Sequence, residues 1–189
     1  MIIELGQIAR IQTGLFAKPG SKGDIVYLQA KHFDENGELM STLYPDLKWE
    51  NNVEKHLLKP GDVLFAAKGS KNFATWYELK NKPAVASTSF FVIRIQENYR
   101  DKIIPEFLVW LINHPHTQKL LKGKAIGTSI ASISKTVLED LKISLPVIET
   151  QKIILKIHSL RLRSKKIQKQ LENLNEQYIQ YLLIKSIQL

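Results

Sequence analysis

Two hydrophobic patterns divide the chain. Up to about Ile95, short apolar runs rich in β-branched and aromatic residues alternate with turn sequences, which is typical of β-strands. The runs are Asp24–Leu28, Val63–Ala66 and Ser89–Ile95. The turn sequences contain Pro or Gly, which tight turns favour; they are Lys18–Gly23, Asn36–Gly37 and Lys59–Asp62. This half is therefore expected to be mainly β.

Short helices are predicted between residues 96 and 146. Pro105 and Glu106 suit a first helical turn, and apolar residues at helical spacing follow them. The expected elements are a helix from Pro105, a helix from His116 to Lys122 that stops at Gly123, a helix from about Lys135, and a closing strand from Leu141 to Leu145.

The pattern changes after Pro146. Neither Gly nor Pro occurs from Val147 to Leu189, and helix formers dominate this segment. Spacings of four and three residues alternate along it, as in the seam of a coiled coil. The seam positions are Ile153, Ile157, Leu160, Ser164, Ile167, Leu171, Leu174, Tyr178 and Tyr181.

A single helix of this length would reach roughly 55 to 60 Å, far more than a small domain needs. Its apolar stripe must be buried against something. Two arrangements satisfy this requirement: the helix pairs with a second helix, or it folds back on its own domain. Ser164 interrupts the seam inside a cationic stretch, which weakens packing there and helps to fix the register or direction of pairing.

These patterns predict an α+β fold. A β-rich domain with a few short helices is expected over residues 1–146, and one long C-terminal coiled-coil helix over residues 147–189. A chain of 189 residues has room for one domain with a core of its own and an appendage.

Composition excludes several classes of protein. The chain has no cysteine, which excludes disulfides, thiolate zinc sites and a cysteine nucleophile. The first ten residues do not resemble a signal peptide, and no apolar run approaches the roughly 18 residues of a membrane span. The expected location is the cytoplasm, with no membrane partner.

Charge favours a polyanionic partner, since the net charge is +9 and the pI is about 9.6. Residues 150–189 carry eight Lys or Arg against two Glu, whereas residues 1–149 carry 19 basic against 16 acidic side chains, a net charge of only +3. Any DNA-binding surface on the body must therefore be a local patch. The cationic stretch from Arg161 to Lys169 suits three roles equally: a solvated coiled-coil face, a contact with DNA, or a contact with an acidic partner.

Three ordered sequence pieces resemble the DNA-specificity (S) subunit of type I restriction-modification systems, and they span essentially the whole chain. They are Leu5–Gly14 (LGQIARIQTG), Leu57–Ser70 (LLKPGDVLFAAKGS) followed by Ala86–Ser87, and a Gly127–Ile130 loop leading to Leu141–Ile154 (LKISLPVIETQKII). The resemblance implies a partner of double-stranded DNA, methyltransferase (modification) subunits that supply the catalysis, and indirectly the restriction subunit.

The chain departs from that family in two respects. Family members usually carry two recognition domains and two helices, whereas this chain resembles half of such a subunit. The resemblance therefore implies a homodimer joined by the long helices, with an antiparallel direction favoured over a parallel one, in which helix length sets the spacing of two half-sites. The second departure is Glu149-Thr150-Gln151, where the family commonly has adjacent Glu and Gln.

Three loops carry the side chains that DNA recognition requires. Phosphate contacts need Lys, Arg or hydroxyls, and base-edge contacts need groups such as the Asn amide. The candidates are Lys18, Lys22, Lys31, Lys68, Ser70, Lys71, Asn72, Lys124, Thr128 and Ser129. Lys68, Lys71 and Asn72 rank highest, while any single lysine is equally well explained as part of a solvated loop. For Trp76 and Tyr77, packing is favoured over base stacking.

Enzymatic alternatives rest on weaker patterns. Pro45-Asp46 with Glu78-Leu79-Lys80 matches the PD…ExK sequence motif of many metal-dependent nucleases, although Asp46 lies in a turn-like stretch. No Walker loop, serine elbow or methyltransferase motif is present, so no catalytic centre, cofactor or metal is expected. The alternatives to a DNA-specificity subunit are a small nuclease and a coiled-coil adaptor without a DNA role.

Overall fold

The computed structural model describes residues 2–34, 36–49, 53–68, 72–78, 83–125 and 132–187. The chain divides into two compact units, a body that ends at Gln151 and a second unit that begins at Lys152. The fold is α+β, with small sheets and short helices in the body and one long helix after it.

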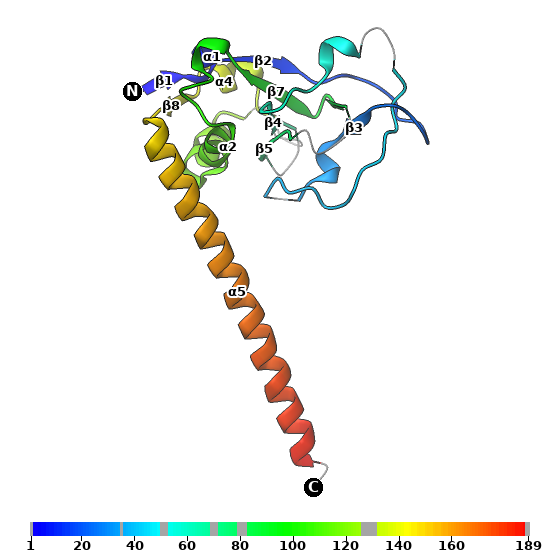
Figure 1. The fold of residues 1–189 in the computed structure, drawn as a ribbon, viewed down its shortest axis with the longest axis vertical. Coiled ribbons are helices and arrows are strands. Elements are labelled where there is room, and N and C mark those ends of the chain that lie inside the picture. Colours follow the sequence, from blue (N-terminus) through cyan, green and yellow to red (C-terminus); the bar gives the residue numbers. More distant parts are fainter. Residues whose placement is uncertain are drawn as a thin grey trace. The chain divides into compact units, whose positions relative to one another are not determined.

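A four-stranded antiparallel sheet forms the centre of the body (Figure 1). Its strand order is β2 (Ala9–Thr13), β7 (Phe90–Ile95), β4 (Val63–Ala66) and β5 (Ala74–Trp76). β7 lies between β2 and β4, so its residues pair on both sides; Ile93 is opposite Ile11 and Val63. The β-branched and aromatic residues of β7 suit this half-buried position.

Two smaller pairings flank the central sheet. β1 (Ile2–Glu4) pairs antiparallel with β8 (Lys142–Ser144), which joins the two ends of the body. β3 (Val26–Leu28) pairs parallel with β6 (Ala84–Ala86). The first pairing lies at one end of the body and β3 lies toward the other (Figure 1).

Among its described residues the body has four short α-helices, α1 (Leu5–Ile8), α2 (Pro105–Asn113), α3 (Pro115–Gly123) and α4 (Lys135–Glu139). Three single turns of 3-10 helix occur at Ala30–His32, Glu54–His56 and Glu97–Tyr99. His114 separates α2 from α3 and caps α3, because its Nδ1 accepts from the backbone N–H of His116.

Asn113 at the end of α2 protects the edge of the central sheet. Its Oδ1 accepts from the Ala74 N–H at 2.7 Å, and its Nδ2 donates to the Ala74 carbonyl at 2.8 Å. A side-chain amide thus replaces a neighbouring strand at β5, which removes an edge that another chain could pair with.

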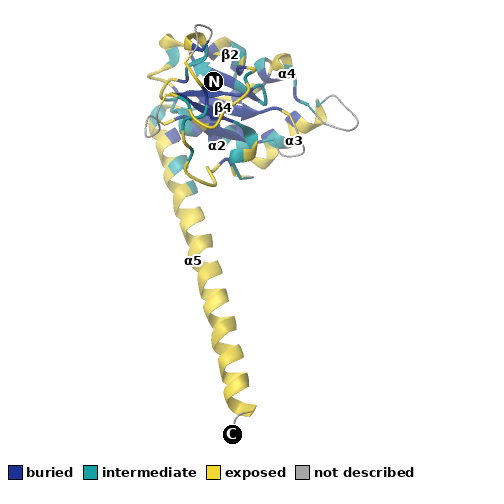
Figure 2. Cartoon of the chain, turned by 90° about the vertical axis from the view of Figure 1, so that its right-hand side faces the viewer, coloured by how far each residue is buried: buried dark blue, intermediate teal, exposed yellow. Residues whose placement is uncertain are grey.

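The core of the body is apolar, and the strands of the central sheet are largely buried (Figure 2). Its largest fully buried side chains include Phe65, Phe90, Leu64 and Ile93. The rings of Phe73 and Phe90 meet edge to face, with their centroids 6.1 Å apart. Among the described residues, every buried side-chain nitrogen or oxygen has a hydrogen-bond partner.

The helix α5 (Ile148–Ile187) is 40 residues long, and Gln151 is its one buried residue. The apolar seam residues from Ile153 to Tyr181 are between 47% and 62% exposed. Figure 2 shows the contrast with the body, since α5 is exposed along nearly all of its length.

The pattern of the sequence predicts most elements with small errors at their ends. The α+β class, the strand Val63–Ala66 and the helices from Pro105 and Lys135 are confirmed, and the long helix begins at Ile148. No strand was predicted after the candidate loop residues Lys68 and Asn72, which is wrong, because Ala74–Trp76 forms β5. The strand predicted from Asp24 begins two residues later, where pairing with β6 starts. The predictions omitted β1, α1, β2 and β6, which are short or lack an alternating pattern.

Candidate nucleic-acid interface

The Lys59-Pro60-Gly61-Asp62 sequence forms a tight turn that supports the central sheet. Gly61 has φ of +85°, a conformation that residues with a Cβ rarely adopt. The Asp62 carboxylate accepts from the Lys59 N–H at 2.8 Å, and the Gly61 N–H donates to the Tyr77 carbonyl at 3.1 Å. The turn therefore has a structural role.

Asp62 also forms a buried ion pair with Arg94 of β7. The Arg94 guanidinium donates to both carboxylate oxygens, from Nε at 2.7 Å and from Nη2 at 2.6 Å, and Nη2 also donates to the Leu57 carbonyl. The hydrogen bonds and charge of Asp62 raise the pKa of Arg94. Burial, with the nearby Asp62 carboxylate, raises the pKa of the Tyr77 hydroxyl. These groups are partners of one another within the body, not ligands for DNA.

Lys18 and Lys22 lie on an exposed segment that is hydrogen-bonded to a second exposed segment. The backbone of residues 20–25 contacts that of residues 45–47 through the Gly20 N–H to Asp46 carbonyl bond (2.7 Å), the Gly23 N–H to Pro45 carbonyl bond (3.0 Å) and reciprocal bonds between Ile25 and Leu47. A Cβ on Gly23 would lie 2.4 Å from the Leu47 backbone. Only glycine, which has no Cβ, therefore fits at position 23, where the two segments meet.

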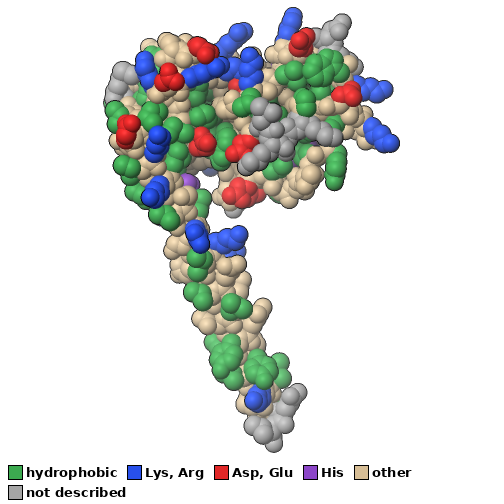
Figure 3. All heavy atoms as spheres, viewed as in Figure 1, with side chains coloured by type: hydrophobic (Ala, Val, Ile, Leu, Met, Phe, Trp, Pro, Cys, Tyr) green, Lys and Arg blue, Asp and Glu red, His purple; other side chains and the backbone are tan. Residues whose placement is uncertain are grey.

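The stretches of chain that include these contacts, residues 16–25 and 44–49, carry three exposed aromatic side chains that were not among the predicted site residues. Phe16 is 77% exposed, Tyr44 is 78% exposed and Trp49 is 50% exposed. The same two stretches of chain carry the exposed Lys18, Lys22 and Lys48, and we call this set of three aromatic and three lysine side chains the aromatic–lysine surface. In Figure 3, hydrophobic and cationic side chains gather at the end of the body that carries β3. The missed signal was the occurrence of aromatic residues beside lysines in segments that show no strand alternation.

Asp46 stabilises the backbone that carries the aromatic–lysine surface by accepting a hydrogen bond. Its Oδ1 accepts from the Tyr27 N–H at 2.9 Å, and the Tyr27 hydroxyl in turn donates to the Leu15 carbonyl at 2.9 Å. Asp24 accepts from the Trp49 N–H at 3.3 Å. The two carboxylates are therefore used to hold the segments, while the lysines extend into solvent.

Lys31 lies in the 3-10 helix next to His32. The His32 Nδ1 accepts from the Gln29 N–H at 3.2 Å, an interaction that requires this nitrogen to be unprotonated. Burial lowers the pKa of His32, the charge of Lys31 lowers it further, and Asp46 partly opposes the change. Lys31 is exposed and is free to contact a partner's phosphate.

The second and third predicted loops meet at the end of β4. Lys68 is exposed and forms a bridge with Ser132, and the Ile133 N–H donates to the Ala67 carbonyl at 3.0 Å. Asn72 donates from Nδ2 to the Ala66 carbonyl at 2.9 Å, so its amide closes the loop after β4. The other candidates of these loops fall outside the described residues; they are Ser70, Lys71, Thr128 and Ser129.

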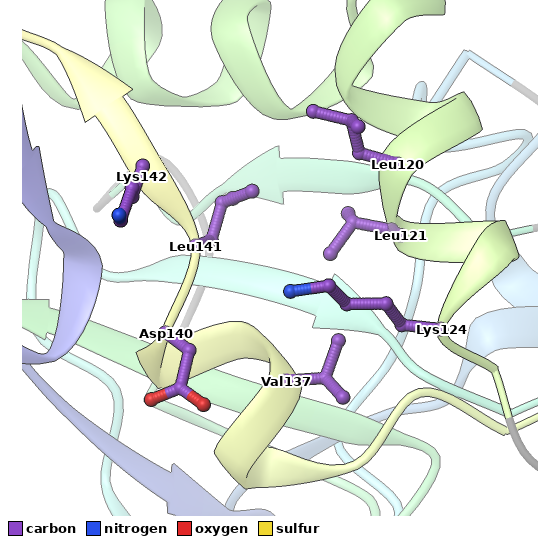
Figure 4. Close-up of a pocket in the computed structure, with 7 residues that line it drawn as sticks. All are labelled: Leu120, Leu121, Lys124, Val137, Asp140, Leu141 and Lys142. Carbon is purple, nitrogen blue, oxygen red and sulfur yellow. The ribbon is translucent and has the colours of Figure 1, made fainter.

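Lys124 follows α3 and lines a pocket of about 280 Å³ between α3, α4 and β8. The pocket walls are mainly apolar, formed by Leu120, Leu121, Val137 and Leu141. Figure 4 shows the Lys124 side chain extending across the pocket toward Leu141. Tyr77 is buried, as the packing role favoured for it requires, whereas Trp76 lies on the edge strand and is 37% exposed.

The described residues contain no group of three or more His, Asp or Glu side chains placed to hold a metal ion. Asp46 is engaged with the Tyr27 backbone, and Glu78 accepts a hydrogen bond from the Trp76 indole at 3.3 Å. Lys80 lies outside the described residues. Within the part of the chain that is described, no helix has the length and apolar content needed to span a lipid bilayer.

The chain thus combines a β-rich body, which bears exposed cations and aromatics, with one long helix after it. The family model for the type I restriction modification DNA specificity domain matches residues 1–176. The chain therefore belongs to the family of type I restriction-modification specificity subunits, and the sequence resemblance is confirmed.

Relatives agree with this assignment. The type I restriction enzyme MjaX specificity subunit of Methanocaldococcus jannaschii is 33% identical over 120 residues, which cover 60% of this chain and 27% of that protein. The HsdS subunit from Thermoanaerobacter tengcongensis has a similar fold, with a TM-score of 0.59, 16% identity, and coverage of 87% of this chain and 37% of that one. The S subunit from M. genitalium matches with a TM-score of 0.57, 15% identity, and coverage of 85% and 38%. The chain thus spans well under half the length of these relatives.

Proposed function

We propose that the chain is a non-catalytic DNA-reading subunit that directs partner methyltransferase subunits, and through them a restriction subunit, to a bipartite site in double-stranded DNA. The aromatic–lysine surface carries the proposal, because it joins exposed rings and cations on the body of a DNA-specificity family member. Residues 1–146 are the recognition domain in this proposal, and residues 147–189 are the pairing helix.

The chemistry of this surface suits DNA. Lysine ammonium groups neutralise phosphates and supply affinity that depends on salt. Exposed rings such as Phe16 and Tyr44 would lose unfavourable contact with water by packing on sugars or bases. Because the body as a whole has a charge of only +3, a local surface of this kind is more effective than a diffuse positive field.

Lys68 belongs to a second proposed contact area at the end of β4, next to Ser132. The loops on both sides of this point carry further cations and hydroxyls in the sequence. In the proposal this area holds the backbone of DNA, while the aromatic–lysine surface contributes to selectivity.

A complex of two copies is part of the proposal, and the exposed seam of α5 supports it. The solved relatives are matched over 85% to 87% of this chain and over 37% to 38% of their own length. Two copies joined through α5 would supply two recognition domains. Methylation in this proposal is performed by the partner subunits, and this chain supplies no catalytic group.

The test compares DNA binding by charge-reversal variants of the full chain in complex with its methyltransferase subunits. Lys18→Glu/Lys22→Glu should weaken binding to a selected site by at least about tenfold and lower the salt dependence by about one unit per lysine. Lys68→Glu should weaken it less. The matched control is Lys119→Glu/Lys142→Glu, which makes the same charge change at exposed positions on α3 and β8.

An equal loss of DNA affinity in the control variant would show that the effect comes from net charge alone and not from the aromatic–lysine surface. No loss in any variant would favour the coiled-coil adaptor. Metal-dependent cleavage of DNA by the purified chain, abolished by Asp46→Asn, would favour the nuclease. Sedimentation that finds only monomer at micromolar concentration would remove the dimer from the proposal.

A further inference from the structure

Phe16 is an exposed aromatic side chain between two residues that pack into the body. Its side chain is 77% exposed, whereas the preceding Leu15 is 8% exposed. Leu15 belongs to a buried apolar cluster that includes Tyr27 and Val85, and Ala17 packs against the same cluster. The chain therefore presents one large ring to solvent between two side chains that are anchored in the core.

The Tyr27 hydroxyl fixes the backbone on both sides of Phe16. It donates to the Leu15 carbonyl at 2.9 Å and accepts from the Ala17 N–H at 3.3 Å. The Leu15 N–H in turn donates to the Ala86 carbonyl at 2.8 Å. Tyr27 is 3% exposed, so water has little access to its hydroxyl and competes weakly for these hydrogen bonds. A single buried hydroxyl thus connects the residue before Phe16 with the residue after it.

Tyr27 also supports the segment that carries Tyr44. Its backbone N–H donates to Oδ1 of Asp46 at 2.9 Å, and Asp46 follows Tyr44 by two residues. The Asp46 N–H donates to the Ile25 carbonyl at 3.0 Å, next to the start of β3. Phe16 and Tyr44 are exposed to nearly the same extent, at 77% and 78%. The two segments that bear these rings therefore share one buried support.

A ring on a fixed backbone is suited to discriminate between DNA sequences. Fixing the backbone before binding lowers the entropy that is lost when the complex forms. Contacts of an aromatic ring with base edges, such as a thymine methyl group, are apolar and release no counterions, whereas lysine contacts with phosphates do. Lys18 follows Phe16 by two residues, so a cation that can hold a phosphate lies close in the chain to the ring.

We infer that Tyr27 is a positioning residue for sequence discrimination, because its hydroxyl presents the Phe16 ring to the bases of the target site. The lysines of the aromatic–lysine surface supply affinity that depends on salt, and Phe16 supplies a contact that does not. This inference rests on the proposed DNA-reading function and adds the residue that separates target from non-target DNA, together with the residue that holds it in place.

The test measures the affinity of the full chain, in complex with its methyltransferase subunits, for a selected site and for a shuffled sequence of the same length. Phe16→Ala should lower the ratio of the two affinities at least about fivefold and leave the salt dependence unchanged. Tyr27→Phe keeps the buried ring and removes the hydroxyl, and it should lower the ratio at least about threefold. The double variant should lose no more than Phe16→Ala alone, because Tyr27 acts through Phe16.

Two control variants make the same kinds of change elsewhere in the body. Ile2→Ala truncates a side chain that is 75% exposed on β1, at the opposite end of the body from β3 (Figure 1). Tyr77→Phe removes the hydroxyl of a second tyrosine, which is 5% exposed. Both should leave the ratio of the two affinities within about 1.5-fold of the unmodified complex, since surface changes away from a contact have small effects.

Several results would overturn the inference. An equal loss on both DNAs with Phe16→Ala would make Phe16 a contact without sequence preference, and loss of the methyltransferase subunits from the complex would make it a protein contact. Additive losses in the double variant, or unfolding of the body by Tyr27→Phe, would show that the hydroxyl supports the core and does not act through the ring. If the unmodified complex binds both DNAs equally, the proposed function itself fails, and this inference fails with it.

Discussion

The body and α5 differ in how far their apolar side chains are buried. Within the body, side chains such as Phe65 and Ile93 are fully buried by the same copy. Along the 40 residues of α5, Gln151 is the one buried side chain, and the apolar seam is about half exposed. The body therefore contains its own source of stability, whereas a single copy leaves the apolar seam of the helix in contact with water.

This difference can be measured because the two regions report through separate signals. The three tryptophans, Trp49, Trp76 and Trp110, all lie in the body, so fluorescence follows its unfolding alone. Far-ultraviolet circular dichroism is dominated by the long helix α5. A change confined to one region should alter one signal and spare the other.

The largest effect is expected from Leu171→Glu, which removes the partner of α5 and leaves the body intact. If two copies pair through α5 as proposed, each dimer would bury two carboxylates at the seam, where charge without a counterion is costly. The dissociation constant of the dimer should rise at least about a hundredfold in sedimentation equilibrium. The fluorescence midpoint of thermal unfolding should not change.

Leu162→Glu is the matched control for this change. Leu162 lies on the same helix, on the side opposite the seam, and is 50% exposed, against 56% for Leu171. It should alter dimer affinity by less than about threefold, because a glutamate there stays in water. Equal effects of the two substitutions would show that the seam is not the contact surface.

A smaller effect is expected at the start of α5, where the comparison is sharpest. Gln151 is fully buried, and its amide contacts three backbone groups: it donates to the carbonyls of Lys102 (2.7 Å) and Pro146 (2.8 Å) and accepts from the Ile104 N–H (3.0 Å). Gln151→Ala would leave these groups without partners and cost about 3 kcal/mol. For a body of this size the fluorescence midpoint should fall by roughly 10 °C.

The control is Gln180→Ala on the exposed part of α5, where the amide contacts only Glu176. This substitution should leave the fluorescence midpoint within about 1 °C of the unmodified chain. If Gln151→Ala has no larger effect than Gln180→Ala, the first turn of α5 does not belong to the body, and the boundary of the two regions must be moved.

The sequence predicts the helix better than the body. A single period of seven residues, free of Gly and Pro, is sufficient to identify α5. In the body, β4 and β7 have strong apolar runs and were found, whereas β1 and β6 are three residues long and pair with strands distant in sequence. Tertiary pairing of this kind leaves no local pattern.

The family motifs predict the framework and not the candidate interface. Asp62 forms an ion pair with Arg94, Gly14 packs against the Ser87 backbone, and Gln151 forms hydrogen bonds at the start of α5. These motif residues therefore have structural roles in the fold. Phe16 and Tyr44 lie between the motifs in turn-like segments, and only the hydrogen bonds between residues 20–25 and 45–47 show that these two segments lie side by side. Proximity of two loops cannot be derived from spacing in the sequence.

The smallest effect is a pH dependence that should be confined to the body. Burial, followed by the charge of Lys31, lowers the pKa of His32, so the unfolded chain binds a proton near pH 6.5 while the folded body resists protonation. The contribution of His32 to the stability of the folded body is therefore fully present above about pH 6.5. It is lost as pH falls toward the pKa of His32 in the folded body. Titration of the fluorescence-detected stability from pH 8 to pH 5 should show this decrease, and His32→Asn, which keeps an acceptor for the Gln29 N–H, should lack it. The difference between the two proteins should be absent from the dimer affinity, because α5 does not include His32. A difference curve that is flat, or that rises on acidification, would show that His32 is protonated as easily in the folded body as in the unfolded chain.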